Sequence, residues 1–309
     1  MKLLYVADSH FRKSIPSCRI DSDFYGNQLA KLKRVCVLAR QHQVDYVLHG
    51  GDLFDESDTP LQLINDVMDI LKDARLKWIV NPGNHDIFGA NLATLTRSGL
   101  GILWKAGVID IGCGIETREL DKSVVLRMIP YMMSVDPALY QFTAYDHSKI
   151  HIIMTHDMLT TFPVPFQHTE LKNVNTNADL VLCSHWHSQF KERPNTTTFI
   201  NPGPLVRQTV NEVNQKPSVC LINTNPASVQ FLEVKHEPAS KVIKIPEVQS
   251  PMNETATQFL QTVASASFEK VDRQQLVRKV GEQLKCKESV IEAALGRVVE
   301  AETALEVGK

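Results

Sequence analysis

The amino-terminal quarter of the chain alternates short apolar runs with longer segments whose apolar residues recur every three or four positions. Residues 2–7, 45–48 and 78–80 are the apolar runs, and residues 27–41 and 60–74 lie between them. Such runs are typical of buried strands, and the intervening periodicity is typical of helices with one face toward a core. A β-α-β-α-β order favours parallel strands joined by right-handed crossovers. This alternation predicts an α/β fold.

The second half of the chain is expected to be largely β-structure. One further helix is expected at residues 92–106, and strands are expected at residues 108–111, 124–129, 149–154, 179–182, 197–200, 219–223, 229–234 and 242–245. Two facing sheets flanked by helices would bury both faces of these strands. Composition changes near residues 246–251, and helical patterns follow. We therefore expect a main domain at residues 1–249 and a small helical appendage at residues 250–309.

Polar side chains follow several of the predicted strands directly. The carboxyl ends of parallel strands meet at one edge of a sheet, so these side chains are expected to converge. They are oxygen and nitrogen donors without a thiolate, a set that suits Mn, Fe or Zn better than Cu(I) or an iron–sulfur cluster. Seven donors are too many for one ion. The donors are Asp8, His10, Asp52, Asn84, His156, His185 and His187.

The donors fall in five short motifs that occur in a fixed order. They are D-x-H from Asp8, G-D from Gly51, G-N-H-D from Gly83, T-H from Thr155 and H-x-H from His185. In this order they resemble the calcineurin-like metallophosphoesterase superfamily, over roughly the first two thirds of the chain. The resemblance implies a four-layer αββα metallophosphoesterase sandwich that binds two divalent metal ions.

Within that superfamily, three phrases resemble the SbcD nuclease subunit, the bacterial and phage counterpart of a repair nuclease. They are Gly51-Asp-Leu-Phe-Asp55, His156-Asp-Met-Leu with Phe166-Gln-His168, and Asn201-Pro-Gly-Pro-Leu-Val-Arg207. The resemblance implies Mn²⁺ as the metal, DNA as the substrate, a homodimer, and an SbcC-like coiled-coil ATPase as the partner. The helical appendage resembles in position the segment that docks on that ATPase.

Two residues depart from the family pattern at positions that are not ligands. Ser184 stands where the family usually has glycine, and Ser9 stands where SbcD-like chains commonly have tryptophan. Because neither position supplies a ligand, we expect little effect on metal binding. The sequence Phe11-Arg12-Lys13 also differs from the usual continuation of D-x-H.

The resemblance also implies how the ligands divide between two ions. Two cations roughly 3.5–4 Å apart can activate a bridging water and clamp a phosphate, and they need a carboxylate between them. Asp52 is the candidate for this bridge. By resemblance, one ion is held by Asp8, His10, Asp52 and His187, and the other by Asp52, Asn84, His156 and His185.

His85 is left over from both ligand sets and is predicted to be catalytic. By resemblance, it protonates the leaving 3′ oxygen or binds the scissile phosphate. Asp55 follows Asp52 by three residues, and by resemblance to the His–Asp pair of related phosphatases it is predicted to orient and charge His85. The alternative for Asp55 is a cap before the helix that Pro60 opens.

Several other residues have two alternative roles. Arg12, Lys13, Lys191, Arg193 and Arg207 either grip DNA phosphates or are solvated loop charges. Trp186 either packs beneath the metals, which we favour, or stacks on a base.

The apolar stripe at residues 60–74 most simply faces the sheet. Leu63 and Ile70 lie off the main stripe and are candidates for a dimer face.

Three functions fit the sequence. We favour a Mn²⁺-dependent DNA nuclease, with 3′ to 5′ exonuclease activity on duplex ends and endonuclease activity on single strands, in an SbcCD-type complex. The alternatives are a small-substrate metallophosphoesterase, acting on nucleotides or a phosphoprotein, and a non-catalytic scaffold. An open basic groove would favour a polymeric substrate, whereas a closed pocket would favour a small-molecule substrate. The intact ligand set and His85 argue against a scaffold.

Charge, cysteines and hydropathy bear mainly on location. The formal net charge of −2 gives no bulk electrostatic argument for nucleic acid binding. The six cysteines are scattered without a C-x-x-C pair, which favours free thiols in a reducing compartment. No apolar run approaches the length of a membrane span. We expect a cytoplasmic protein that does not bind membranes. It would act in a bacterial cell or, if a phage encodes it, in the cytoplasm of the phage's host.

Overall fold

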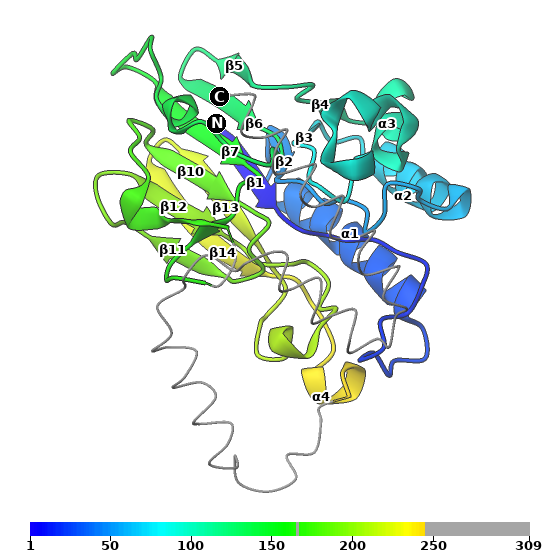
Figure 1. Ribbon diagram of the computed structural model, residues 1–309. Coiled ribbons are helices and arrows are strands. Elements are labelled where there is room, and N and C mark those ends of the chain that lie inside the picture. Colours follow the sequence, from blue (N-terminus) through cyan, green and yellow to red (C-terminus); the bar gives the residue numbers. More distant parts are fainter. Residues whose placement is uncertain (165–166, 245–309) are drawn as a thin grey trace, which may run out of the picture. The chain divides into compact units, whose positions relative to one another are not determined.

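The computed structural model describes residues 1–164 and 167–244, which form two facing six-stranded sheets (Figure 1). The strands of the first sheet are β1 (Lys2–Val6), β2 (Tyr46–His49), β3 (Trp78–Val80), β4 (Asp110–Ile111), β13 (Ser218–Thr224) and β14 (Ala227–Glu233). They lie in the order β14-β13-β1-β2-β3-β4. Strands β1 to β4 are parallel, while β13 and β14 extend the sheet as an antiparallel pair beside β1.

The second sheet is also parallel at its centre. Its strands are β5 (Glu116–Asp121), β6 (Val124–Ile129), β7 (Ile150–Thr155), β10 (Leu180–Cys183), β11 (Phe190–Glu192) and β12 (Thr198–Asn201). They lie in the order β11-β12-β10-β7-β6-β5. The two edge strands, β5 and β11, pair antiparallel with their neighbours. The inner strands β6, β7 and β10 are mostly apolar because both of their faces are largely buried.

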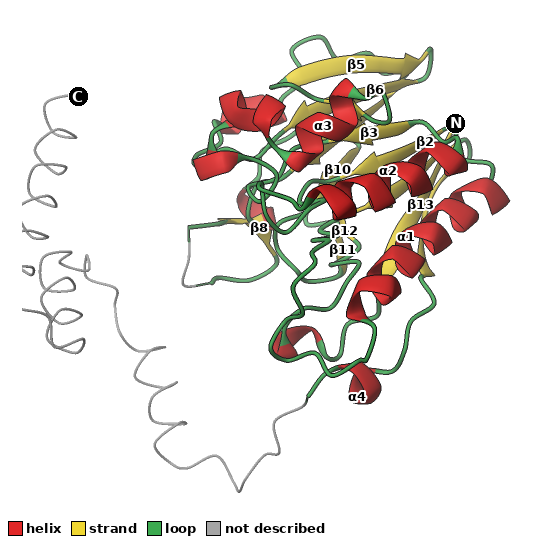
Figure 2. Ribbon diagram, turned by 90° about the vertical axis from the view of Figure 1, so that its right-hand side faces the viewer, coloured by secondary structure: helices red, strands yellow, loops and turns green. Residues whose placement is uncertain are grey.

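Three helices cover the outer face of the first sheet, as Figure 2 shows: α1 (Phe24–Gln41), α2 (Leu61–Ala74) and α3 (Gly99–Lys105). Helix α1 begins three residues earlier than the sequence pattern indicates. The side chain of Asp23 caps it by accepting a hydrogen bond from the backbone N–H of Gly26. Helix α2 begins directly after Pro60, which occupies its N-cap position and makes no side-chain capping bond.

The side chains of β1 show how the layers pack. Leu4 and Val6 belong to the core between the first sheet and the helices. Leu3 and Tyr5 point the other way, into the core between the two sheets. This alternation follows from the two-residue period of a strand. Strand β1 is therefore buried on both faces, as the predicted sandwich requires.

A third apolar cluster covers the outer face of the second sheet. It contains strand residues such as Ile153 and Val181 together with Tyr140 and Leu171. The last two belong to the short 3-10 helices η3 (Pro137–Tyr140) and η4 (Leu171–Asn173), near the two-stranded pair of β8 (Leu159–Thr160) and β9 (Thr169–Glu170). The predicted mixed α/β sandwich is confirmed, and 3-10 turns and loops form its fourth layer in the described residues.

Two local predictions are wrong. The helix expected at residues 92–106 is interrupted at Ser98, which separates the 3-10 helix η2 (Leu92–Arg97) from α3 and caps α3 through its hydroxyl. The strand expected at residues 242–245 is replaced by the helical turn α4 (Ala239–Val242), and Ile243 makes an isolated bridge to Arg19. Strand β5 was missed because its burial alternates over mostly charged residues.

The dimer face suggested for Leu63 and Ile70 is also wrong. Leu63 is fully buried and Ile70 is 9% exposed, and both belong to the core beneath the helices. Helix α2 packs against both α1 and α3 as well as the sheet, so residues off the main stripe are covered too. Leu61, at the first turn of α2, is 71% exposed.

The chain divides into units Met1–Ile245 and Pro246–Lys309. The predicted boundary at residue 250, the helical appendage and its docking role lie outside the described residues.

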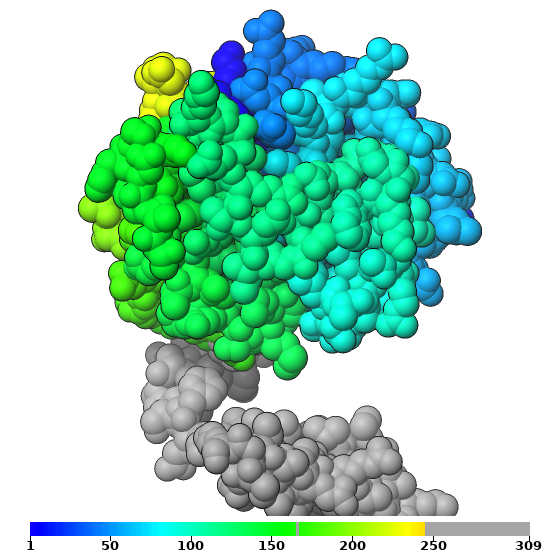
Figure 3. All heavy atoms as spheres, turned by 90° about the horizontal axis from the view of Figure 1, so that it is seen from above, coloured from blue at the N-terminus to red at the C-terminus, as the bar shows by residue number. Residues whose placement is uncertain are grey.

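In the space-filling view of Figure 3, blue and cyan atoms of the amino-terminal segments join green atoms of the middle segments in one surface. None of the helices in the described residues is long and apolar enough to cross a bilayer.

Candidate metal centre

The predicted donors come from the carboxyl ends of strands in both sheets. Strand β1 is followed by Asp8 and His10, β2 by Asp52 and β3 by Asn84, while β7 and β10 of the second sheet are followed by the remaining histidines. Four of the predicted ligands adopt left-handed backbone conformations: Asp8 (φ 47°), His10 (φ 44°), Asp52 (φ 53°) and His185 (φ 68°). Residues other than glycine rarely adopt this conformation, and it concentrates at functional sites.

Asp8, His10 and His187 form the first of two clusters, with one donor atom of each within 4.8 Å of the others. The Nε2 atoms of His10 and His187 lie 3.0 Å apart. The second oxygen of Asp8, Oδ1, accepts a hydrogen bond of 3.0 Å from the backbone N–H of His185. The cluster is thus tied to the neighbouring one through the H-x-H loop.

Asp52, His156 and His185 form the second cluster within the same distance limit. Oδ2 of Asp52 lies 3.1 Å from Nε2 of His156 and 3.6 Å from Nε2 of His10. The carboxylate of Asp52 therefore faces both clusters, which is the position that a bridging ligand requires.

The imidazoles are oriented so that their outer nitrogens are already engaged. Nδ1 of His156 lies 2.9 Å from the carbonyl oxygen of Gly50, and Nδ1 of His187 lies 2.8 Å from a carboxylate oxygen of Glu212. Each acceptor holds a proton on Nδ1, so Nε2 is the nitrogen that faces the cluster and is available to a metal ion. Metal-binding histidines are typically held in this way.

Unsatisfied buried oxygens show that the centre fits cations. Oδ2 of Asp8 and Oδ1 of Asn84 are buried and have no hydrogen-bond partner. Buried polar atoms are nearly always paired, so both oxygens are suited to a ligand that the protein itself does not supply. Their oxygen character and the surrounding imidazoles match divalent ions such as Mn²⁺ or Zn²⁺.

The electrostatics of the centre also favour positive charge. Burial alone would lower the pKa of His156, but the adjacent carboxylate of Asp52 raises it to about 9. Burial alone would raise the pKa of Asp52, and the imidazoles of His156 and His10 outweigh that effect and lower it. The pKa of His185 is lowered to about 3, first by burial and then by His156. A carboxylate this strongly held in its charged form is a good cation ligand.

His85 lies at the open side of the centre and is exposed. Its backbone N–H donates a hydrogen bond of 2.8 Å to Oδ1 of Asp52, and its Nδ1 lies 2.7 Å from the backbone carbonyl oxygen of Asp55. Nε2 is the nitrogen left for a substrate. His85 also belongs to a group of possible donors with His10 and Asp52, so its place beside the ligands is close.

The predicted partnership between His85 and the side chain of Asp55 is wrong in its detail. The contact to His85 uses the backbone carbonyl of Asp55. The carboxylate of Asp55 instead lies 3.2 Å from Nδ1 of His10 and 2.8 Å from Arg12, and these contacts lower its pKa against the opposing effect of burial. The alternative of a helix cap is wrong too, because Pro60 is the N-cap of α2.

The structure also brings in three buried residues that the sequence did not single out. Glu212 accepts from His187, as described above. Asp86, the last residue of the G-N-H-D motif, accepts backbone N–H groups of Gly83 (2.9 Å) and Phe54 (3.2 Å), and burial and then Asp52 raise its pKa to about 7. His49 precedes the G-D motif. The sequence signal that could have pointed to Asp86 or to His49 is, in each case, the motif that contains it or follows it. Glu212 carries no such signal.

Both family departures are buried and hydrogen-bonded behind the ligands. The Ser9 hydroxyl lies 2.8 Å from Nε2 of His49. Because Nδ1 of His49 accepts from the backbone N–H of Gly51, Nε2 carries the proton and donates to Ser9. The Ser184 hydroxyl lies 2.8 Å from the carbonyl oxygen of Gly50 and 3.0 Å from Nδ1 of His156. Both serines therefore support ligand loops.

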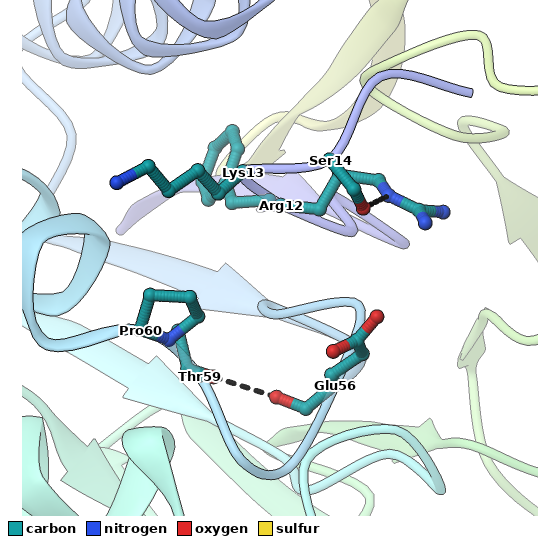
Figure 4. Close-up of a pocket in the computed structure, with 7 residues that line it drawn as sticks. Arg12, Lys13, Ser14, Glu56, Thr59 and Pro60 are labelled. Atoms are coloured by element: carbon teal, nitrogen blue, oxygen red, sulfur yellow. Dashed lines mark hydrogen bonds between the residues drawn. The ribbon is translucent and has the colours of Figure 1, made fainter.

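Hollows lie on two sides of the centre. One has a volume of about 370 Å³, with Arg12, Lys13 and Ser14 along one wall and Glu56, Thr59 and Pro60 along the other (Figure 4). It adjoins the centre because Arg12 pairs with Asp55, which contacts His10. The other hollow, of about 200 Å³, is lined by Tyr131, Met133, Asp157, His168 and His185, among others.

The other predicted basic and aromatic residues are distributed as follows. Lys191 and Arg193 line a separate hollow at the edges of β10, β13 and β14, and Arg207 is buried. Trp186 packs against the ring of Phe162 at a centroid distance of 6.0 Å and against the outer core of the second sheet.

Comparison with known proteins identifies the family. Residues 1–189 match the family model described as "Calcineurin-like phosphoesterase", which covers more than half of the chain. This protein belongs to the calcineurin-like phosphoesterase family. A search of curated proteins finds no match.

The solved structures that match this calcineurin-like phosphoesterase share little sequence with it. A dimetal phosphatase from Danio rerio is 10% identical, with 76% of this chain and 99% of that one aligned at a TM-score of 0.49. A protein from Thermus thermophilus, TT1561, is 13% identical over 76% of this chain and 99% of that one, at a TM-score of 0.48. An archaeal phosphodiesterase is 14% identical over 75% of this chain and 99% of its own, at a TM-score of 0.41.

Membership in the calcineurin-like phosphoesterase family makes the protein a metal-dependent phosphoesterase with a dimetal centre. The bound ions supply an activated water and neutralise charge on the phosphoryl oxygens. The residues of the two clusters would hold those ions, and Gly50 and Glu212 orient two of the imidazoles through hydrogen bonds to Nδ1.

Proposed function

We propose that this phosphoesterase is a Mn²⁺-dependent DNA nuclease that degrades duplex ends from 3′ to 5′ and cuts single strands internally. The observation that carries the proposal is the exposed position of His85 beside the centre, next to a hollow whose wall carries Arg12 and Lys13. An open approach with two cations on one wall suits a phosphate backbone that extends beyond the scissile bond. The SbcD-like phrases described above support the same substrate.

His85 supplies the acid in this proposal. Its Nδ1–H donates to the carbonyl oxygen of Asp55, which fixes the ring and directs a protonated Nε2 toward the leaving 3′ oxygen. General acids positioned in this way commonly contribute about 10²–10⁴-fold to the rate. Arg12 is held by Asp55 near the same side and is placed to contact an adjacent phosphate.

The proposal includes a homodimer and an SbcC-like ATPase partner. Both rest on the subfamily resemblance. They are testable by size-exclusion chromatography with light scattering and by co-purification with a coiled-coil ATPase encoded beside this chain. The dimer proposal no longer involves Leu63 and Ile70, which are buried.

A phosphoesterase for small substrates is the second candidate. It is favoured by the hollow of about 200 Å³ beside His185, where the ring of Tyr131 lies 5.5 Å from that of His185. A hollow of this size is smaller than a typical pocket for a drug-sized ligand and would hold a small phosphoester. The ligand set cannot distinguish the two candidates, because both use the same centre.

A direct comparison of substrates tests the proposal. Purified full-length protein with Mn²⁺ is incubated with 3′-labelled and 5′-labelled duplex DNA, a circular single strand, and bis-p-nitrophenyl phosphate, with and without an ATPase partner. Shortening of the duplex from its 3′ ends and cutting of the circle support the nuclease. Hydrolysis of the small ester alone, with the partner present, would support the second candidate.

A further inference from the structure

A compact group of basic residues lies beside helix α1, which contributes Lys31 and Arg34. Arg19, Lys31, Arg34 and Arg207 line a cavity of about 60 Å³, which we call the basic pocket. Arg19 is 9% exposed, Lys31 6% and Arg207 3%, so three basic side chains are almost fully buried together. Long cationic side chains are rarely buried without partners of opposite charge.

The described residues provide little negative charge for the basic pocket. The guanidinium of Arg19 forms a bidentate pair with Asp21, with two contacts of 2.8 Å. Within residues 1–164 and 167–244, no carboxylate forms an ion pair with Lys31, Arg34 or Arg207. Glu237 also lines the pocket, but its carboxylate is exposed and pairs with Lys241 at 3.8 Å.

Backbone carbonyls hold the cations in place without neutralising them. Lys31 Nζ donates to the carbonyl oxygen of Leu205 at 3.0 Å, Arg34 to that of Lys235 at 2.7 Å, and Arg207 to that of Glu237 at 2.6 Å. Nε of Arg207 is buried without a hydrogen-bond partner. The pocket thus has fixed donors and at least one donor to spare, a preorganised arrangement for an acceptor-rich ligand.

The cations affect one another strongly. The pKa of Lys31 is lowered to about 7, first by burial and then by the charges of Arg207 and Arg19, with a smaller contribution from Arg34. The pKa of Arg207 is also lowered, first by burial and then by the charge of Arg19. Unpaired charges of one sign in a buried site are costly, and an anion between them would relieve that cost.

We propose that the basic pocket is a second anion site, separate from the metal centre, that binds a phosphate group. Its volume corresponds to roughly four or five water-sized spheres of about 10–15 Å³, which suits the five heavy atoms of a phosphate and excludes a nucleoside. Guanidinium groups match phosphate oxygens in geometry as well as charge. This inference does not depend on the proposed nuclease activity.

The basic pocket is coupled to the metal centre through one short segment. The carbonyl oxygen of Leu205 accepts from Lys31, and the backbone N–H of Leu205 donates to the carbonyl oxygen of Asp8 at 3.2 Å. Gln208, next to Arg207, donates to the carbonyl oxygen of His10 at 2.7 Å. A phosphate in the pocket therefore binds against the segment that supports two predicted ligands, but it uses none of the ligands themselves.

Phosphate titration of the full-length protein tests the site. Inorganic phosphate is titrated calorimetrically into wild type, Lys31→Met, Arg34→Gln and the matched control Lys33→Met, which alters an exposed lysine on the same helix. We expect wild type and Lys33→Met to share a class of phosphate site that is weakened roughly tenfold or more in Lys31→Met. Arg34 is half-buried at the rim of the basic pocket, so Arg34→Gln provides a second test of phosphate binding if Lys31→Met does not fold.

The result that overturns the proposal is equal phosphate binding by Lys31→Met, Arg34→Gln and Lys33→Met, because any binding would then belong to the metal centre alone. Melting temperature gives an independent readout, since a ligand that binds only the native state raises it. Phosphate should raise the melting temperature of wild type and Lys33→Met by a larger amount than that of Lys31→Met.

A second arm identifies the source of the phosphate. Binding of a labelled DNA duplex is measured by fluorescence anisotropy for the same variants. If a backbone phosphate occupies the basic pocket, Lys31→Met weakens DNA binding and inorganic phosphate competes with DNA. If the pocket takes free phosphate, Lys31→Met loses phosphate binding and binds DNA as Lys33→Met does. Both outcomes support a phosphate site and differ only in what carries the phosphate.

Discussion

The carboxylate of Glu212 lies 2.8 Å from Nδ1 of His187, and the opposite nitrogen of that ring, Nε2, faces His10 at 3.0 Å. Glu212 is 3% exposed and is itself fixed by the backbone N–H groups of Gln208 and Thr209. Its pKa is lowered against burial, chiefly by the bond to His187. The relationship makes Glu212 a positioning residue that sets which nitrogen of His187 is available to a metal ion.

Replacing Glu212 by glutamine is expected to weaken metal binding by roughly 10–100-fold, as is usual when the partner of a metal-binding histidine is changed. The metal affinity is measured by calorimetric titration of Mn²⁺ into the full-length variant. Glu233→Gln is the matched control, because Glu233 is exposed and lies far from the ligands in the fold's edge strand. Equal affinity for the two variants would remove Glu212 from the site.

Replacing His85 by alanine should leave the metal content near that of wild type and lower turnover by about 10²–10⁴-fold. The reason is that His85 belongs to neither predicted ligand set, although it lies beside His10 and Asp52, and its Nδ1 contacts the backbone carbonyl oxygen of Asp55. Metal content is measured by mass spectrometry of the purified protein alongside the rate on a phosphodiester. His147→Ala serves as the control, because it alters an exposed histidine that packs against Tyr145. Loss of metal comparable with the loss of rate would make His85 a ligand instead.

Asp52→Ala is expected to abolish binding of both ions, because the carboxylate faces His156 in one cluster and His10 of the other. The number of ions per chain is measured after dialysis against Mn²⁺. Asp86→Asn is a useful comparison, since Asp86 accepts backbone N–H groups and is not among the predicted ligands. Retention of two ions by Asp52→Ala would contradict the bridging role.

The burial of Lys31 makes a prediction about stability and pH. Its pKa is about 7 in the folded protein and near 10.5 ordinarily. Between these values the unfolded chain binds a proton that the folded chain does not, so the free energy of unfolding rises with pH across this range. The charged groups facing Lys31 are Arg207, Arg19, Asp21 and Arg34.

Lys31→Met should remove that dependence. Its gain in stability over wild type is expected to be largest below pH 7 and to shrink as the pH rises, while Lys33→Met should follow wild type. Chemical denaturation at several pH values, in buffers free of phosphate and sulfate, measures the difference. A constant difference between Lys31→Met and wild type from pH 6 to pH 9 would show that Lys31 does not titrate in this range.

Much of the centre could be predicted because its donors directly follow apolar strands. Asp8, Asp52 and His156 each leave a buried strand at its carboxyl end, and parallel strands bring such positions together. The same logic cannot find Glu212, which lies in the 3-10 turn η5 (Val210–Glu212) after an irregular segment. Its approach to His187 depends on how that segment returns to the sheet, which no local pattern specifies.

The errors have physical causes as well. The resemblance to related phosphatases placed the side chain of Asp55 beside His85, but the chain turns so that the backbone carbonyl of Asp55 meets His85 and its carboxylate meets His10. Strand β5 carries alternating charged residues at a sheet edge, so it lacks the apolar run that marks the inner strands. Leu63 seemed free for a partner because periodicity cannot show that α2 is flanked by two other helices.

Anomalous X-ray diffraction at the manganese edge, from crystals of the full-length protein grown with Mn²⁺, tests the central claim most directly. We predict two peaks roughly 3.5–4 Å apart, one bounded by Asp8, His10 and His187 and the other by Asn84, His156 and His185, with Asp52 between them. A single peak, or peaks away from these side chains, would contradict the claim.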